Sequence, residues 1–311
     1  MEKYRQTHRS YKTIRSLIFS MHHIPVLLNE VIQYLEPENG DIFVDATFGF
    51  GGHSREIAPQ LGPNGRIIGI EKDFAVYDID CADKTLSDHR LTLVRDDFKN
   101  IDLILEKEGV SKVNKILFDL GVSSYHFDES EKGFSFSGDQ PLDMRLDTQS
   151  GVTAQDLING LTEKELADLF YNLADERASR QIAKRIILER KKEKITSTAR
   201  LVEIVSKAKT GGRINPATKV FQALRMAVND ELGVIKEALP KAINLLEKGG
   251  RLAVISFHSG EDRIVKNIFK DFAKINEVKI LTKKPVSASM TEIRQNPRSR
   301  SAKLRVVERN K

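Results

Sequence analysis

The feature that most constrains the fold is a short apolar run that ends in an acidic residue and opens into glycines. Ile42–Asp45 is followed by glycines at 49, 51 and 52, and then by a helical pattern from about His53 to Leu61. Glycines let the backbone approach a ligand closely, and the first turn of a helix offers free N–H groups. A strand, a glycine loop and a helix in this order predict a nucleotide-binding α/β fold.

Four more apolar runs of strand length alternate with helical patterns. These runs cover residues 66–71, 91–94, 115–119 and 251–257. Strands without polar alternation, separated by helices, are typical of a parallel sheet covered on both faces. We also expect residues 277–281 and 302–308 to close the sheet as an antiparallel pair at its edge. The predicted fold class is therefore α/β, with a Rossmann-like doubly wound sheet.

The stretch between the fourth and fifth predicted strands is too long for an ordinary crossover connection. Apolar residues recur at helical spacing over residues 162–173, 175–193, 198–209 and 217–247. Thr162 and Glu165 stand three residues apart, as in a capping box at a helix start. We predict an inserted all-α domain at 127–215, with the sheet domain formed by 21–126 and 216–311.

The net charge of +6 is concentrated at the two ends of the chain. Residues 1–20 carry five Lys and Arg against one acid, and residues 283–311 carry nine against two. Basic clusters of this kind suit a polyanion, because each neutralised phosphate releases counterions; solvated tails without a partner are the alternative. We expect residues 1–20 to be a disordered basic extension ahead of Met21, or to reflect a misassigned start.

Other classes of protein are disfavoured by composition. No apolar run approaches the roughly 18 residues that cross a bilayer, so no membrane contact is expected. Cys81 is the single cysteine, which excludes an internal disulfide and a Cys-rich metal site. No metal is expected, and the cysteine content fits a cytoplasmic protein.

The acidic residues at the predicted strand ends select among nucleotide ligands. The dinucleotide fingerprint needs a third glycine where Ser54 stands, and Asp45 would repel a pyrophosphate. An acidic residue there suits the ammonium and sulfonium of S-adenosylmethionine. Glu71, at the end of the second strand, is placed to accept hydrogen bonds from both ribose hydroxyls. The alternative is a tight turn beside a surface glutamate.

Three further residues follow strands at the same predicted edge. Phe98 could stack on an adenine, although a core phenylalanine explains it equally well. Asp119 ends the fourth strand and should face the reacting group, because ligands of such sheets bind outside the carboxyl ends of the strands. His258 follows the fifth strand. Asp119 as a turn residue and His258 as a structural histidine are the alternatives.

An ordered set of longer motifs resembles one family, the ribosomal RNA small-subunit methyltransferase H family, also called MraW. The motifs are HIPVLLNE (23–30), DATFGFGGHS (45–54), FDLGVSS (118–124), GFSF (133–136), PLDMR (141–145), FQALR (221–225), ISFHS (255–259), EDRIVK (261–266) and NPRSRSAKLR (296–305). Any one of them could arise by chance, but the ordered set is specific. The resemblance covers the chain from His23 onward.

The resemblance implies a class I S-adenosylmethionine-dependent methyltransferase whose inserted helical domain recognises the substrate. It further implies methylation of N4 of a cytidine in the decoding region of 16S rRNA in the small ribosomal subunit. The cofactor-binding residues that the resemblance implies are Gly51, Gly52, His53, Glu71, Phe98, Asp119 and His126, to which the strand-end argument adds Asp45. His126 stands where relatives often carry Gln, and Glu71 where Asp is frequent.

The implied reaction is an in-line methyl transfer to an amine, in which positioning supplies most of the acceleration. Asp119, His258 or solvent would accept the proton that leaves. The predicted RNA-binding residues are Arg145, Arg294, Arg298, Arg300, Lys303 and Arg305. A homodimer stays open. So do three alternatives: the same fold acting on another RNA, a non-catalytic RNA-binding assembly factor, and a nicotinamide-dependent oxidoreductase.

Overall fold

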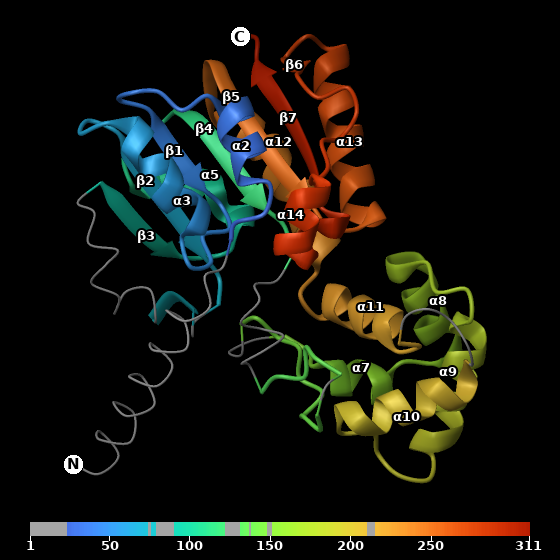
Figure 1. The fold of residues 1–311 in the computed structure, drawn as a ribbon. Helices are drawn as coiled ribbons and strands as arrows, with labels where there is room; N and C mark the ends of the chain where they lie inside the picture. The colour runs from blue at the N-terminus through green and yellow to red at the C-terminus, as the bar shows by residue number, and fades with distance from the viewer. Residues whose placement is uncertain are drawn as a thin grey trace, which may run out of the picture.

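The structure is a computed structural model (Figure 1). It describes residues 24–73, 76–78, 90–121, 131–136, 138–147, 151–209 and 215–311. His126 and the basic extension 1–20 lie outside these residues.

A seven-stranded sheet forms one part of the molecule, in the order β3-β2-β1-β4-β5-β7-β6. Its strands are β1 (Ile42–Asp45), β2 (Arg66–Glu71), β3 (Leu91–Arg95), β4 (Val113–Asp119), β5 (Leu246–Ser256), β6 (Val278–Ile280) and β7 (Lys303–Arg309). Strands β1 to β5 pair in parallel, whereas β7 is antiparallel to both β5 and β6. All five predicted parallel strands and the predicted antiparallel edge pair are confirmed.

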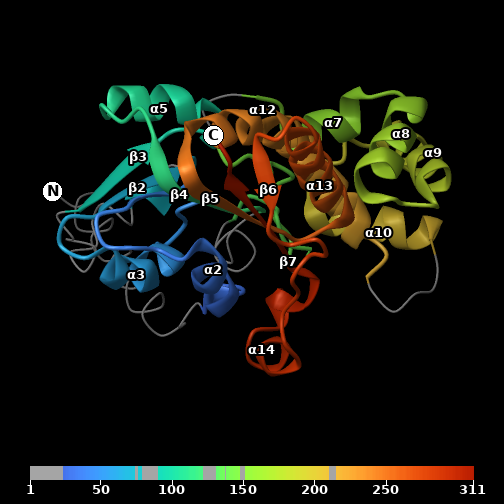
Figure 2. The same ribbon diagram turned by 90° about the horizontal axis from the view of Figure 1, so that it is seen from above.

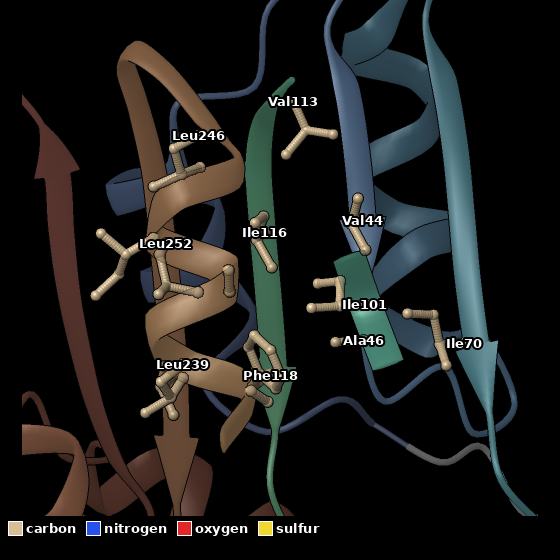
Figure 3. Close-up of a cluster of buried hydrophobic side chains, with 14 of the residues drawn as sticks. Val44, Ala46, Ile70, Ile101, Val113, Ile116, Phe118, Leu239, Leu246 and Leu252 are labelled. Atoms are coloured by element: carbon tan, nitrogen blue, oxygen red, sulfur yellow. The ribbon is translucent and has the colours of Figure 1, made fainter. Parts of the chain in front are cut away.

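Helices cover both faces of the sheet, as the unbroken apolar strands predict (Figure 2). The helices on one face are α5 (Ile101–Lys107), α12 (Glu231–Leu245) and α13 (Ser259–Lys274), and on the other α2 (Leu28–Leu35) and α3 (Gly52–Ile57). Val44 and Phe43 of β1 point to opposite faces, and each lies in a separate apolar cluster. Figure 3 shows the first cluster, where Ile116 and Phe118 meet Leu239 of α12.

Five helices form a second body beside the sheet (Figure 1). They are α7 (Ala154–Gly160), α8 (Glu163–Ala174), α9 (Ser179–Arg190), α10 (Thr198–Ala208) and α11 (Thr218–Val228). These helices share their own apolar cluster, which includes Phe170, Ile186 and Leu201. The capping box predicted at Thr162 and Glu165 is present. It satisfies N–H groups that the first turn of α8 would otherwise leave free.

One predicted helix, 217–247, is wrong because the structure breaks it into α11 and α12. Asp230 has a left-handed backbone with φ of 48°, which interrupts the helix. The preceding side chain, Asn229, binds the backbone of residues 144–146. The Asn229 amide donates to the Met144 carbonyl at 2.8 Å and accepts from the Leu146 N–H at 2.9 Å. Because Leu224 of α11 packs in the helical cluster, that cluster extends past the boundary proposed at residue 215.

Four short elements remain among the described residues. They are η1 (Ala58–Leu61), η3 (Phe98–Asn100), α14 (Met290–Gln295) and η4 (Pro297–Ser301). In Figure 2, α14 projects away from the sheet. Among the described helices, none combines the length and apolar character that a bilayer crossing requires.

Candidate active site

The loop between β1 and α3 needs glycine at two positions. Gly51 has φ of 67°, and a Cβ there would lie 2.6 Å from Cζ of Phe48. A Cβ at Gly52 would lie 2.9 Å from Cγ of Pro25. A larger residue at either position would force these neighbours apart, so the glycines set the shape of the loop.

Asp45, at the carboxyl end of β1, is almost completely buried. Its Oδ2 accepts a hydrogen bond from the Ser54 hydroxyl at 2.7 Å, which explains why a serine replaces the third glycine of a dinucleotide loop. Within the described residues, its Oδ1 has no hydrogen-bond partner. Burial raises the pKa of Asp45 to about 6, although the hydrogen bonds from Ser54 and Thr47 oppose this shift.

Glu71, at the carboxyl end of β2, joins its own loop to the glycine loop. Its Oε2 accepts the Gly49 N–H at 3.0 Å, and its Oε1 accepts the Asp73 N–H at 2.7 Å. Burial raises the pKa of Glu71 to about 7, and the nearby charge of Asp73 acts in the same direction. The two backbone donors fix the orientation of the carboxylate that the sequence assigned to a ribose.

Asp119 ends β4, the neighbour of β1 in the sheet. Its N–H donates to Oγ1 of Thr47 at 2.6 Å, which holds the end of β4 against the glycine loop. Its side chain is 24% exposed, and within the described residues its Oδ1 has no hydrogen-bond partner. Burial raises the pKa of Asp119 to about 8, together with the charges of Asp45 and Glu261.

His53, in the first turn of α3, lies between Val26, which precedes α2, and Asp119 at the end of β4. Its Nε2 is 3.0 Å from the Val26 carbonyl oxygen, and its Nδ1 is 3.8 Å from Oδ2 of Asp119. Because a carbonyl oxygen only accepts, Nε2 carries the hydrogen of this bond. In the neutral ring, the lone pair on Nδ1 therefore faces Asp119.

The carboxyl groups of Asp45 and Asp119 determine which kind of ligand the edge of the sheet can bind. Asp45 and Asp119 each hold a buried oxygen atom without a partner among the described residues, and the pKa of each is raised. A ligand that brings positive charge and N–H or O–H donors would relieve both penalties. S-adenosylmethionine has these groups, so the residues fit it. A dinucleotide pyrophosphate would add negative charge at the same place.

Phe98 lies near this edge but also belongs to the protein core. It is half-buried, and its ring meets the Phe118 ring edge-on with centroids 5.4 Å apart. Asp97 caps η3 through the Lys99 N–H at 3.0 Å, and it pairs with Lys72 Nζ at 2.8 Å. Phe98 therefore takes part in packing against the core, and the structure places it beside the strand ends without showing a contact to a ligand.

His258 caps helix α13, which limits the chemistry available to it. Its Nδ1 accepts the N–H groups of Gly260 at 3.2 Å and Glu261 at 3.4 Å. A neutral imidazole has one such lone pair, so Nε2 must carry the hydrogen. To accept a proton, His258 would have to give up its cap. The geometry therefore favours an N–H donor over the proton acceptor that the sequence suggested.

Glu231, His258 and Glu261 come close enough together to resemble a metal site, with ligand atoms within 4.8 Å of one another. Arg225, however, already donates to both oxygens of Glu231, at 2.7 and 2.9 Å. The lone pair of His258 is used by the helix cap. The group is therefore better described as an ion pair between Arg225 and Glu231 beside the N-cap of α13. A metal ion needs ligand atoms with free lone pairs, and the positive charge of the buried Arg225 would repel it.

The arginines of the C-terminal segment lie at the surface. Arg294, Arg298 and Arg300 are exposed on α14 and η4. Lys303 is 37% exposed and lies 3.7 Å from Oδ2 of Asp262. The three arginines therefore form a basic surface that a phosphate chain can reach, with Lys303 at its margin.

Two other predicted RNA contacts are engaged within the protein. Arg305 is only 7% exposed, and its guanidinium binds Asp262 at 2.7 and 3.3 Å. This burial is inconsistent with a phosphate contact, because Arg305 lies inside the β7–α13 packing. Arg145 is bound to Asp143 by two hydrogen bonds of 2.8 Å. This pair is partly exposed, so Arg145 could meet a phosphate only at its outer edge.

Two contributors to the site were missed by the sequence analysis. Thr47 joins the ends of β1 and β4, and Lys132 pairs with the buried Asp73 at 3.1 Å, next to Glu71. The motif containing Thr47 could have pointed to it. The partner of Lys132 lies 59 residues away and no local pattern marks the pair.

The strand order with an antiparallel β7, and the carboxyl groups at the ends of β1, β2 and β4, define a class I methyltransferase fold. Comparison with known proteins agrees with this class. Residues 20–310 match the model of the MraW methylase family, and the chain belongs to this family. The predicted family and fold class are confirmed.

Curated relatives share the name Ribosomal RNA small subunit methyltransferase H. The protein from Persephonella marina is 46% identical over 293 residues, which covers 92% of this chain and 99% of the relative. The protein from Geotalea uraniireducens is 42% identical over 307 residues, which covers 93% and 98%. A solved rRNA methylase from Streptococcus thermophilus is similar with a TM-score of 0.43 and 12% identity, over 91% of this chain and 94% of that one. That structural similarity is too low to support a conclusion.

Proposed function

We propose that this protein uses S-adenosylmethionine to methylate N4 of a cytidine in 16S rRNA of the small ribosomal subunit, in the cytoplasm. One observation carries the proposal: within the described residues, Asp45 and Asp119 hold unpartnered carboxyl oxygens at the ends of adjacent strands. The name shared by the relatives supports the substrate.

The residues of the site divide the work of binding the cofactor. Glu71 is held by two backbone N–H groups and accepts the ribose hydroxyls. Gly51 and Gly52 let the loop pack closely against Phe48 and Pro25. Asp45 supplies negative charge, and Asp119 adds to it when the bound cation favours its ionised form. When bound, the cofactor supplies an electrophilic methyl group on a sulfonium.

Asp119 is the strongest candidate to accept the proton released by the methylated amine. To accept this proton, Asp119 must first be ionised. Because its pKa is raised to about 8, the ionised carboxyl group then takes up a proton readily near neutral pH. His258 keeps the hydrogen on Nε2, which lies 3.2 Å from Oε1 of Glu261, and serves the site by holding the first turn of α13. Alignment of the amine supplies most of the acceleration, because the nucleophile carries its own lone pair.

The basic surface formed by Arg294, Arg298 and Arg300 provides the phosphate contacts in this proposal. Single-stranded or splayed RNA is the form in which a base edge can enter a pocket. The helical body beside the sheet then recognises the surrounding RNA. A homodimer is part of the proposal, and sedimentation velocity tests it: a single monomeric species would refute it.

The function is tested with small subunits that lack the modification. The purified chain is incubated with methyl-labelled S-adenosylmethionine and assembled subunits, an assembly intermediate or free RNA, and nucleosides are analysed by mass spectrometry. We expect N4-methylcytidine at one position, and none with the variant Asp119→Asn. Product on another base would refute the cytidine assignment, and failure to bind the cofactor in calorimetry would refute the enzyme class.

A further inference from the structure

Two hydrogen bonds tie the C-terminal helix α14 to the start of the described chain. Oε1 of Glu292 accepts the N–H of Leu27 at 2.8 Å, across 265 residues of sequence. Nδ2 of Asn296 donates to the carbonyl of Ile24 at 2.9 Å. We call residues 24–27 with these two side chains the terminal clamp.

Glu292 is used in an uncommon way for its position in the helix. It is the third residue after the N-cap Ser289, whose hydroxyl accepts the Glu292 N–H at 3.1 Å. A glutamate at this position ordinarily returns its side chain to the backbone of the N-cap. Here the carboxylate reaches Leu27 instead. The local cap is therefore half complete, and the side chain serves a distant segment.

The segment held by the clamp is strained and closely packed. Leu27 is fully buried and has φ of 54°, a backbone conformation that a leucine adopts only when its surroundings impose it. Pro25 packs against Gly52 so closely that a Cβ on the glycine would lie 2.9 Å from the proline ring. Small movements of residues 24–27 would therefore be transmitted to the glycine loop.

The clamp also fixes the carbonyl that orients His53. Val26 lies between the two clamped residues, and its oxygen accepts from Nε2 of His53. This bond places the hydrogen on Nε2 and turns the lone pair of Nδ1 toward Oδ2 of Asp119, 3.8 Å away. At this separation the two groups are not hydrogen-bonded, but the negative end of the Nδ1 lone pair lies toward the carboxyl group and disfavours its ionised form. His53 thereby favours the form of Asp119 that exists after the amine has lost its proton.

We infer that Glu292 is a positioning residue for methyl transfer: by holding residues 24–27, it keeps His53 in the tautomer and orientation that support Asp119 as proton acceptor. The inference rests on the proposed function for the identity of the reaction. The same short segment carries the exposed Arg294, Arg298 and Arg300.

The test compares three substitutions in the full-length chain. Glu292→Ala removes the acceptor, Glu292→Gln keeps an oxygen that can accept the Leu27 N–H, and Thr291→Ala alters the exposed neighbouring residue as a control. Single-turnover methylation of small subunits is measured from pH 6 to 9, with the subunit concentration varied. We expect Glu292→Ala to lower the rate about ten-fold and to shift its pH profile, at an unchanged half-saturating concentration of subunits. Glu292→Gln should restore most of the rate.

A second measurement does not depend on catalysis. Nitrogen NMR of His53 reports which ring atom carries the hydrogen, and we expect Nε2–H in the parent chain and in Glu292→Gln, but a mixture of tautomers in Glu292→Ala. If Glu292→Ala does not fold, Asn296→Ala replaces it in the test, because it removes the other hydrogen bond of the clamp at an exposed position. We expect Asn296→Ala to lower the rate and to mix the His53 tautomers, as predicted for Glu292→Ala.

Either of two results overturns the inference: an unchanged His53 tautomer and pH profile in Glu292→Ala, or a Glu292→Gln variant as impaired as Glu292→Ala. A parent chain that shows the expected tautomer but methylates no ribosomal substrate would refute the proposed function alone.

Discussion

Asp119 makes the folded protein less stable in the range where a methyltransferase works, and replacing it with asparagine should reverse this effect. An aspartate in an unfolded chain has a pKa of about 3.9, whereas in the folded chain the pKa of Asp119 is raised to about 8. Between these values the folded chain holds a proton that the unfolded chain has released. The free energy of unfolding therefore falls as pH rises from 4 to 8, and becomes level above 8.

The size of the effect follows from the interval. Each pH unit contributes at most about 1.4 kcal/mol, so the three units from pH 5 to 8 set an upper limit of about 4 kcal/mol. Water reaches 24% of the Asp119 side chain and screens its charge. We therefore expect Asp119 to contribute a decline of about 2 kcal/mol over this range. Asparagine has the same shape and does not titrate.

Urea unfolding without cofactor at pH 5, 6, 7 and 8 measures this contribution. The parent chain should lose stability more steeply than Asp119→Asn, and the variant should be the more stable protein at pH 8 while lacking activity. Asp168→Asn, at an exposed position of α8, serves as the control and should keep the parent slope. Equal slopes for the parent and Asp119→Asn would show that the carboxyl is not buried as described, and would refute the reasoning.

Three further outcomes are expected. Gly51→Ala should destabilise the fold by about 1–3 kcal/mol in urea unfolding and weaken cofactor binding, because φ there is 67° and the loop has no room for a Cβ; an unchanged midpoint would contradict this. The triple variant Arg294→Ala, Arg298→Ala, Arg300→Ala should reduce the slope of log affinity for RNA against log salt by about 2–3, and equal salt dependence would exclude these residues from the interface. Calorimetric affinity for S-adenosylmethionine should be about ten-fold or more lower at pH 5 than at pH 7, because the raised-pKa carboxyls must ionise to hold a cation; pH-independent affinity would contradict it.

The sheet was predictable because its information is local. Each parallel strand is a short unbroken apolar run, and the carboxyl ends of such strands meet at one edge, so strand pattern alone brings Asp45, Glu71 and Asp119 together. The capping box at Thr162 is also encoded in four adjacent residues. In both cases the pattern and the structural cause occupy the same stretch of chain.

The errors arose where a distant partner decides the outcome. Asn229 ends α11 because it binds Met144 and Leu146, more than 80 residues away, and helical periodicity continues through this position regardless. Arg305 stands in a dense basic run, yet Asp262 of α13 takes its guanidinium into the interior. Neither composition nor spacing contains these pairings, since tertiary contacts override local preference.

The terminal clamp also determines when the active site can form during synthesis. The helical body is continuous along the chain from α7 to α11, so its contacts can form before the sheet is complete. In contrast, β5 can pair with β7 only after the C-terminal strand has been synthesised. The hydrogen bond from the Leu27 N–H likewise forms only when Glu292, near the end of the chain, is present. His53 therefore acquires its final support only when nearly the whole polypeptide has left the ribosome. A nascent or truncated chain would hold the glycine loop without a working site.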